Sequence, residues 1–325
     1  MTSSELWSKY IESGNRDEKH EAWAFCGGGK EADELLDLVK EGKKRGTASS
    51  LIAYKTENEE IPSVGDKSII LDSNNEAHLV IVTRKVTVTP FDSVHPYHGF
   101  LEGEGDRTLR YWREVHERFF APDYKETGKD FDPKGEVVLE EFDVIYPPEY
   151  EEKEDIYLTL PIKEEAEAYQ EYKDEFIAFS SHMDGTGSLS SSDDIEKWVE
   201  RENNMWREEC LPEGFVPSTI LVAKRRSDEK VVGMISIRHR LNDYLLKFGG
   251  NIGYSVRPKE RGKGYGKTMM KLALPYLKAL GLENALVTCN DYNEASRRII
   301  LANGGIYENK NECEEGRIER YWIEL

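Results

Sequence analysis

The chain has 325 residues, 38% hydrophobic and 33% charged, which is the composition of a globular protein long enough for two domains. Its formal net charge of −19 argues against indiscriminate binding to nucleic acids or to anionic membranes. No apolar run is long enough to span a membrane, so we expect no membrane partner.

Helical patterns come first in the N-terminal half, and strand patterns follow them. A helix is predicted over 31–41, where charged residues flank an apolar stripe. Runs rich in isoleucine and valine then predict strands over 67–71, 79–88 and 136–145.

A domain boundary is predicted at PPEYEEKED, residues 147–155. Its two prolines oppose helix, and five acidic residues follow with little to bury. We therefore expect one domain over 1–150 and a second over 156–325. The sequence shows no internal repeat that would suggest another organisation.

Short apolar runs predict the strands of the second half, over 156–160, 218–224, 231–239, 251–256 and 285–289, before a closing hairpin. Helices are predicted over 164–179, 193–209, 262–280 and after Asp291. Ser192 is the expected cap of the second helix, and Asp291 with Glu294 forms a capping box for the fourth. This order predicts a mixed sheet with a glycine-rich turn between a strand and a helix.

That turn, RGKGYGKT from Arg261 to Thr268, is suited to bind phosphate. A nucleoside-triphosphate P-loop needs a glycine where this chain has Arg261, and a dinucleotide fingerprint needs glycine or alanine at Lys267. The pattern that fits is Arg-x-x-Gly-x-Gly, formed by Arg261, Gly264 and Gly266. Its glycines let the backbone approach a ligand, and the unpaired amides of a helix start stabilise a pyrophosphate.

The run IGYSVRPKERGKGYGKTMMKLAL, followed by LVTCNDYNEASRRIILANGG, resembles the GNAT family of N-acetyltransferases over roughly 156–325. The resemblance implies that acetyl-CoA is the cosubstrate and that its pantetheine arm lies between strands ending near Val256 and Cys289. The asparagine that bonds this arm in the family corresponds to Asn293. The implied cosubstrate contacts are Val256, Arg261, Gly262, Lys263, Gly264, Tyr265, Gly266, Lys267 and Asn293.

Acetyl transfer to an amine needs a base and a stabilised oxyanion. His239 is the candidate base, because it ends the predicted strand 231–239; the alternative is a structural histidine at a strand end. Backbone amides over 253–256 would stabilise the oxyanion. Residues 182–187 form either a substrate-facing loop or a plain connection between helices.

The acid that protonates the leaving thiolate is not assigned by the sequence. Many GNAT enzymes carry a tyrosine seven residues after the asparagine, where this chain has Ile300. Tyr254 is our candidate for this role, with Tyr292 and Tyr307 as alternatives. Each of these tyrosines is equally well explained as a packed aromatic residue.

In the first half, WAFCGGGKEADELLDLVKEGKKRGTASSL and EGEGDRTLRYWREVHERFF resemble the ASCH domain, a small β-barrel related to PUA RNA-binding folds, over 21–145. The resemblance implies a ligand of the RNA or nucleotide class. A compact branch of the family hydrolyses N4-acetylcytidine with a Lys-x-x-Thr pair and a glutamate. Lys44 and Thr47 match that pair, and Glu102 or Glu104 matches the third member.

Structural explanations of the same residues stay open. The cations around Lys44 are also favourable at the C-terminus of the helix 31–41. Trp112, His116, Phe119 and Phe120 fall at helical spacing, which is typical of a core as well as of a base-stacking surface. The acidic balance of this half favours a small or single-stranded ligand over a long duplex.

We therefore predict an α+β protein with a PUA-like ASCH barrel followed by a GNAT sheet, which transfers acetyl groups from acetyl-CoA to a small-molecule or nucleoside amine. The alternatives are an RNA- or nucleotide-binding module with an inactive GNAT half, and an ASCH amidohydrolase or ribonuclease. No Cys-x-x-Cys pair and no secretory signal pattern occur, so we expect a reduced cytoplasmic protein without a metal site. The closing hairpin could pair across a homodimer.

Overall fold

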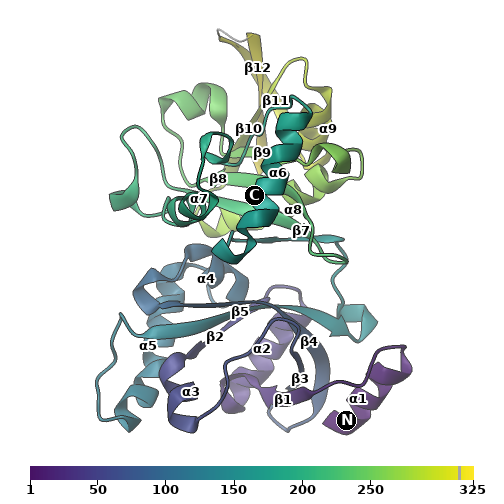
Figure 1. The fold of residues 1–325 in the computed structure, drawn as a ribbon, viewed down its shortest axis with the longest axis vertical. Helices are drawn as coiled ribbons and strands as arrows, with labels where there is room; N and C mark the ends of the chain where they lie inside the picture. The colour runs from purple at the N-terminus through teal and green to yellow at the C-terminus, as the bar shows by residue number, and fades with distance from the viewer. Residues whose placement is uncertain (314–315) are drawn as a thin grey trace. The chain divides into compact units, whose positions relative to one another are not determined.

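Two sheets organise the chain, and each belongs to its own unit. The computed structural model describes residues 1–313 and 316–325, which divide into Met1–Lys153 and Glu154–Leu325 (Figure 1). Both units contain helices and strands, which confirms the predicted α+β class. Among the described residues, no helix is long and apolar enough to cross a membrane.

The first unit is built on a five-stranded sheet in the order β1-β3-β4-β5-β2. β1 runs parallel to β3, and the other neighbours are antiparallel. The register of β4 against β5 shifts after Val80 and again after Thr83, and such bulges bend a strand. The bent sheet forms a half-barrel. Its strands are β1 (His20–Ala24), β2 (Gly46–Ser50), β3 (Lys67–Leu71), β4 (Ala77–Pro90) and β5 (Glu136–Tyr146).

Helices close the core of the first unit with their apolar faces. Leu36 and Val39 of α2 pack with Ile70 and Leu79 of the sheet, because apolar residues recur at helical spacing along α2. The helices are α1 (Ser3–Glu12), α2 (Lys30–Lys40), α3 (Leu51–Glu57), α4 (Pro96–Glu102) and α5 (Leu109–Glu126).

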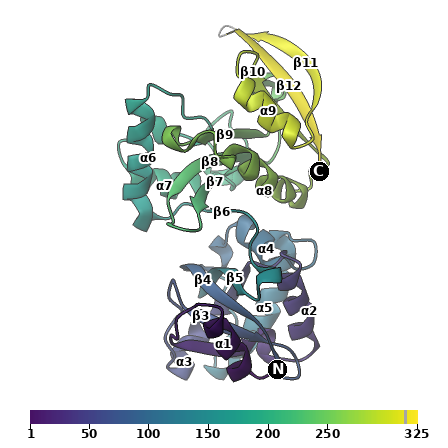
Figure 2. The same ribbon diagram turned by 90° about the vertical axis from the view of Figure 1, so that its right-hand side faces the viewer.

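The second unit is built on a seven-stranded sheet in the order β11-β12-β10-β9-β8-β7-β6, in which only the described pairing of β9 with β10 is parallel. Figure 2 shows β11 and β12 as a long hairpin at the C-terminal end of the chain. The strands are β6 (Ile156–Thr159), β7 (Ser218–Arg225), β8 (Val231–Arg238), β9 (Ile252–Val256), β10 (Asn284–Asn290), β11 (Ile306–Cys313) and β12 (Gly316–Glu324).

Both faces of this sheet are covered, so β7 and β8 are almost continuously apolar. On one face, Tyr172 and Trp198 of α6 and α7 pack with Met234 of β8. On the other face, Met269 of α8 lies against Gly233, where an added Cβ would approach the sulfur to 2.5 Å. The helices are α6 (Ala166–Ala178), α7 (Ile195–Glu202), α8 (Tyr265–Ala279) and α9 (Glu294–Ala302).

The helix expected over 193–209 is shorter than predicted, and Ser192 does not cap it. Asp194 takes that position, since its side chain accepts the N–H of Lys197 at 3.0 Å. The helix ends at Glu202, and the Asn203 side chain donates to the Pro161 carbonyl at 2.9 Å. Such side-chain bonds to the backbone compete with helix formation.

The cap of α9 also differs from the prediction. Asn293, rather than Asp291, is the N-cap, and its side-chain oxygen accepts the N–H of Ser296 at 3.0 Å. Asp291 donates its own N–H to the Arg317 carbonyl at 3.0 Å. Asp291 is therefore held by the neighbouring strand β12 and cannot begin the helix.

Candidate active site

The glycine-rich turn leads directly into α8. Gly262 and Gly264 have φ values of 78° and 90°, and Gly264 is the N-cap of the helix. In the described part of the chain, the N–H groups of residues 262–267 have no hydrogen-bond acceptor, and the first bond of the helix is from Thr268 to the Gly264 carbonyl. An added Cβ at either glycine would meet no atom within 4 Å. The turn therefore presents a row of free amides at a helix N-terminus, which is a site for an anion.

The three cationic side chains around this turn have different partners. Arg261 reaches back, donating to the Val256 carbonyl at 3.2 Å and to the Ser181 Oγ at 2.7 Å. Lys263 pairs with Glu260 at 2.7 Å. Lys267 is exposed, and its ammonium has no ion-pair partner among the described residues. Backbone amides, more than side chains, therefore make up the cradle.

β9 and β10 diverge next to this turn. Their described pairing is limited to Ile252 and Val287, whereas β10 pairs with β12 along its whole length. Arg257 donates its N–H to Val232 of the preceding strand at 2.9 Å. Because these bonds alternate along an antiparallel strand, the N–H groups of Tyr254 and Val256 point to the other side, toward the gap. The gap thus has free donors along one wall.

The first turn of α9, which Asn293 caps, contacts Tyr254 of β9. Asn293 is exposed at the start of α9, where its oxygen caps the helix. The Tyr254 hydroxyl lies 2.9 Å from the Ser296 Oγ of the same helix turn. Burial raises the pKa of Tyr254 to about 12, while its bond to Ser296 opposes the rise, so the phenol is protonated at neutral pH.

A cavity of about 560 Å³ opens on the face of the sheet that carries α6 and α7. It is lined by Ser236 and Arg238 of β8, by residues of the loop 183–188, and by Glu202 of α7. The loop crosses β9 closely: the Ser255 hydroxyl donates to the Asp184 carbonyl at 2.6 Å. The cavity therefore lies beside the strand that forms one wall of the gap.

Glu202 is the buried acid of this cavity. It is 4% exposed, and its Oε1 accepts from the N–H and the hydroxyl of Ser188 at 3.2 Å and 3.1 Å. Burial raises the pKa of Glu202, and the bonds from Ser188 oppose that rise. A carboxylate with a raised pKa suits proton transfer at neutral pH.

His239 lies on the opposite face from the cavity. Alternation along the strand puts it on the side of α8, where its Nε2 is 2.9 Å from the Thr219 Oγ1 and its ring meets Tyr276 edge-on. Burial and the charge of Arg240 lower the pKa of His239 to about 4. The ring is neutral and is not among the described side chains that line the cavity.

Ile300, at the position of the family's tyrosine, is fully buried, and it offers no proton. Tyr292 is 74% exposed and its hydroxyl accepts from Asn290 at 3.0 Å. Tyr307 is 49% exposed and packs edge-on against Tyr321. Of the three candidate tyrosines, Tyr254 is the one at the gap between β9 and the α9 turn.

Sequence reasoning missed Arg238 and Glu202 as cavity residues, whereas Asp184 lies in the loop 182–187, which the sequence predicts either as substrate-facing or as a plain connection between helices. Arg238 stands next to His239, and alternation was the available signal, because it places the two side chains on opposite faces. Glu202 gave no signal, because it lies in an ordinary charged helix. Its burial comes from the approach of Gly187, where an added Cβ would lie 2.5 Å from the carboxylate.

In the first unit, Lys44 joins two of the predicted residues. Its ammonium lies 2.9 Å from Glu102 and 2.8 Å from Glu104, and the Lys44 side chain is 1% exposed. It also lies 5.2 Å from the centre of the Phe25 ring. A buried ammonium held by two carboxylates is charge-compensated, so Lys44 offers little net charge to a phosphate.

Glu102 is the centre of this cluster. Its Oε1 accepts from Trp112 Nε1 at 2.7 Å and lies 3.2 Å from His98 Nε2 and 3.4 Å from His116 Nε2. Burial raises the pKa of Glu102, but Lys44 and then the histidines hold it well below its usual value. Trp112 and His116 stack on each other at 4.3 Å, and both are buried, so they belong to the core, whereas Phe119 is 47% exposed and does not.

Thr47 lies apart from this cluster, half-buried on β2 and paired in register with Glu140. Within residues 1–313 and 316–325, no hydrogen bond joins its hydroxyl to Lys44, Glu102 or Glu104. The structure thus brings together three of the four predicted ASCH residues.

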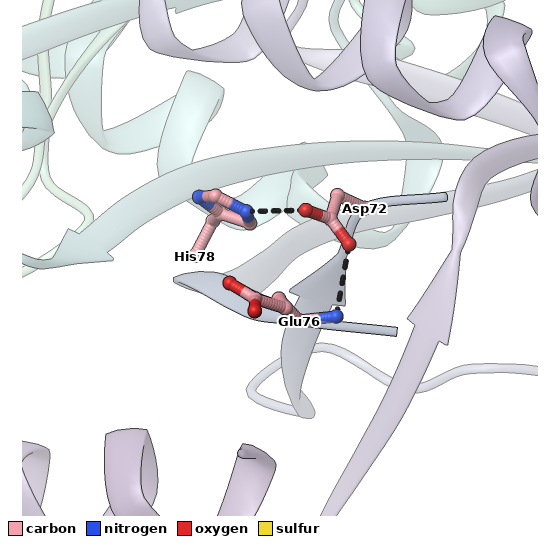
Figure 3. Close-up of side chains that lie close together, drawn as sticks. All are labelled: Asp72, Glu76 and His78. Atoms are coloured by element: carbon pink, nitrogen blue, oxygen red, sulfur yellow. Dashed lines mark hydrogen bonds and ion pairs between the residues drawn. The ribbon is translucent and has the colours of Figure 1, made fainter. Parts of the chain in front are cut away.

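Asp72, Glu76 and His78 offer ligand atoms within 4.8 Å of one another (Figure 3). Asp72 accepts the N–H groups of Asn74 and Glu76 at 2.8 Å and 2.9 Å, and its other oxygen lies 3.0 Å from His78 Nε2. Glu76 pairs with the N-terminal ammonium of Met1 at 3.3 Å. These bonds explain the cluster as the turn between β3 and β4.

Residues 21–146 match the family model of the ASCH domain, and residues 155–306 match that of the acetyltransferase (GNAT) domain. The solved ASCH domain from Lactobacillus crispatus JV V101 is 28% identical, covering 45% of this chain and 94% of its own, with a TM-score of 0.43. Protein EF3133 from Enterococcus faecalis V583 is 33% identical, covering 44% and 86%, with a TM-score of 0.41.

A GNAT-family acetyltransferase from Bacillus anthracis is 18% identical, covering 53% of this chain and 96% of its own, with a TM-score of 0.39. No curated protein matches this chain. The two matched ranges fall one in each structural unit. The chain therefore joins an ASCH domain to a GNAT acetyltransferase domain, and it is an N-acetyltransferase that uses acetyl-CoA.

Proposed function

We propose that residues 261–267 bind the pyrophosphate of acetyl-CoA and that the pantetheine arm lies between β9 and β10. The observation that carries this proposal is the row of free N–H groups over 262–267 at the start of α8. Val256 contributes its N–H at the wall of the gap, and Asn293 stands at its other side. Arg261, Lys263 and Lys267 add positive charge around the diphosphate.

The acceptor amine enters through the cavity on the face of the second sheet that carries α6 and α7. Its nitrogen attacks the thioester carbonyl, and the N–H groups of Tyr254 and Val256 stabilise the oxyanion. We assign the role of proton acceptor to Glu202, because His239 lies on the other face of the sheet. Tyr254, whose phenol is protonated, gives its proton to the leaving thiolate of coenzyme A.

Calorimetric titration of the full chain with acetyl-CoA tests the cosubstrate assignment. We expect binding at micromolar concentrations with one site per chain. A folded sample that gives no heat at those concentrations contradicts the proposal. Release of the thiol in the presence of amines then separates a working transferase from a domain that only binds the coenzyme.

For the ASCH domain, we propose recognition of a nucleoside or a short single-stranded RNA next to Lys44, Glu102 and Glu104, with Thr47 at the edge. The supporting observation is that Lys44 is neutralised by two carboxylates, which favours hydrogen bonding to a base over attraction to a phosphate chain. Titration with cytidine, N4-acetylcytidine and a labelled single-stranded RNA tests this. Conversion of N4-acetylcytidine to cytidine would instead identify this domain as a hydrolase.

A further inference from the structure

Arg238, at the end of β8, lines the cavity and has no carboxylate in contact among the described residues. Its Nη1 donates to the carbonyls of Gly249 and Gly250 at 3.2 Å and 3.3 Å. Within the described residues, its Nε and Nη2 have no hydrogen-bond partner, and no carboxylate lies within ion-pair distance. Burial lowers the pKa of Arg238, and the charge of Asp184 opposes this without contact.

Other packed arginines of this unit have carboxylate partners. Arg257 lies 2.9 Å from Glu175, and Arg297 lies 2.7 Å from Glu319. In a chain with 63 acidic residues, a guanidinium left unpaired inside a cavity stands out. A half-buried guanidinium with no carboxylate in contact can bind an anion, because an arginine fork matches a carboxylate.

The guanidinium lies directly over β9 at Gly253. An added Cβ at Gly253 would lie 3.3 Å from the Nη2 of Arg238 and 3.5 Å from the amide nitrogen of Gly185. The acetyl group is proposed to sit along 253–256 of the same strand. Arg238 would therefore hold an anion close to the carbonyl carbon of the acetyl group.

The rest of the cavity wall has two kinds of surface. Asp184 and Glu202 provide carboxylates, while Met205, Phe215 and Val216 provide an apolar wall. Phe215 is 55% exposed, so this wall continues to the outside. An acceptor that fits has an anionic group, an amine close to it and an apolar side group.

We propose that the acceptor is an amino acid, whose carboxylate binds Arg238, whose side group packs on Met205 and Phe215, and whose amine faces the thioester. This inference rests on the proposed function. The nitrogen lone pair forms a bond to the carbonyl carbon, and the carbon–sulfur bond breaks. The electron pair leaves with coenzyme A as thiolate and takes a proton from Tyr254, while Glu202 receives the proton lost by the amine. The products are an N-acetylamino acid and coenzyme A.

Matched amines test the proposal with the full-length chain and acetyl-CoA, with products detected by mass spectrometry. L-phenylalanine is compared with L-phenylalaninamide, which lacks the carboxylate, with the phosphonate analogue of phenylalanine, and with spermidine. We expect kcat/KM for phenylalanine to exceed that for its amide by about 30-fold or more, because a buried cation loses its partner in the amide complex. L-leucine and L-methionine extend the series to other apolar side groups.

In the variant Arg238→Gln, kcat/KM for phenylalanine should fall to the value for phenylalaninamide. Arg238→Lys keeps the positive charge but not the two parallel N–H donors, so its kcat/KM for phenylalanine should lie between those of the unchanged protein and of Arg238→Gln. Arg240→Gln is the matched control, because Arg240 is exposed and pairs with Glu208 outside the cavity, and it should keep the preference for phenylalanine. Calorimetric titration with acetyl-CoA and circular dichroism show that each variant is folded.

Three results overturn the inference while acetyl-CoA still binds: equal use of the amide or spermidine, an unchanged preference in Arg238→Gln, or no acetylation of any amino acid. A higher kcat/KM for the phosphonate than for phenylalanine would show that the acceptor is a phosphate-bearing amine and not an amino acid. Absence of acetyl-CoA binding instead refutes the proposed function itself. The calorimetric result therefore distinguishes the two failures.

Discussion

The hydroxyl groups of Tyr254 and Ser296 lie 2.9 Å apart, so one hydrogen bond links β9 to the first turn of α9. The bond crosses the gap where β9 leaves β10, next to the helix cap formed by Asn293. A pantetheine arm in this gap would pass the same pair. We propose that this phenol is the proton donor that Ile300, at the family's usual position, cannot be.

Removing only that hydroxyl should slow chemistry without weakening coenzyme binding. For Tyr254→Phe we expect kcat to fall by about 100-fold, which is typical of losing a general acid. The affinity for acetyl-CoA should stay within about twofold, since the ring is kept. Thiol release and calorimetry measure the two quantities. Tyr307→Phe is the control, and an equal loss of kcat in both variants would contradict the assignment.

The free amides before α8 can be blocked without disturbing the rest of the helix. Gly264→Glu should weaken acetyl-CoA binding by about 100-fold, or about 3 kcal/mol, because a carboxylate there repels the diphosphate. Gly281→Glu is closely matched: Gly281 follows the other end of α8, with a φ of 89° against 90° for Gly264 and no atom near an added Cβ. Both variants carry the same backbone strain. Comparable calorimetric affinities would show that the turn does not hold the coenzyme.

The pH dependence of catalysis should report the proton acceptor of the cavity. Burial raises the pKa of Glu202, so at low pH its carboxyl is protonated and cannot accept a proton. We expect kcat/KM to rise with pH through this raised pKa, and Glu202→Gln should lower the rate and remove that limb. Glu200→Gln is the control, since Glu200 is exposed on the same helix and pairs with Lys163. An unchanged profile in Glu202→Gln would exclude the role.

Lys44 should matter strongly for the stability of the ASCH domain. Lys44→Met leaves Glu102 buried without its cation, which costs about 3–5 kcal/mol. Lys43→Met is the control, because Lys43 is exposed and pairs with Glu41. Urea unfolding followed by tryptophan fluorescence measures the difference, and equal midpoints for the two variants would be evidence against the buried pair.

The same pair gives stability a definite pH dependence. Lys44 and the two histidines hold the pKa of Glu102 below its unfolded value, against the effect of burial. Its contribution is therefore present above the unfolded pKa near 4.5 and is lost as pH falls toward the folded pKa. Glu102→Gln should reduce the loss of stability between neutral and acidic pH. An unfolding curve with the same acid slope would contradict this.

Much of the second sheet could be predicted, because its strands are runs of isoleucine and valine buried on both faces. Val231–Arg238 and Ser218–Arg225 differ from their predicted bounds by one residue at one end. In the ASCH domain, β1 (HEAWA) and β2 (GTASS) gave no strand pattern, and they are the edges of their sheet. Edge strands bury fewer side chains, so their composition carries less of the signal.

One part of the candidate site could also be predicted from the sequence, and another part could not. The turn over 262–267 could be predicted, because its function depends on local backbone shape that glycines and a helix start encode. The cavity could not, because Arg238, Gly185 and Gly253 meet only through tertiary contacts between a strand end, a loop and a second strand. His239 was predicted as the base because of its residue type, but the side chain that lines the cavity is that of its neighbour Arg238.

The cradle before α8 consists of main-chain N–H groups, which every amino acid except proline supplies. Side chains at 263 and 267 can thus change through evolution while coenzyme recognition is retained, provided the chain keeps its left-handed conformation at Gly262 and Gly264. Saturation mutagenesis of this turn should give a sharply uneven tolerance, with the exposed positions 263 and 267 permissive and the glycines intolerant, since an added Cβ at Gly266 would lie 2.7 Å from Ile299. The proposed coenzyme site therefore depends on the shape of the backbone at this turn more than on the chemistry of its side chains.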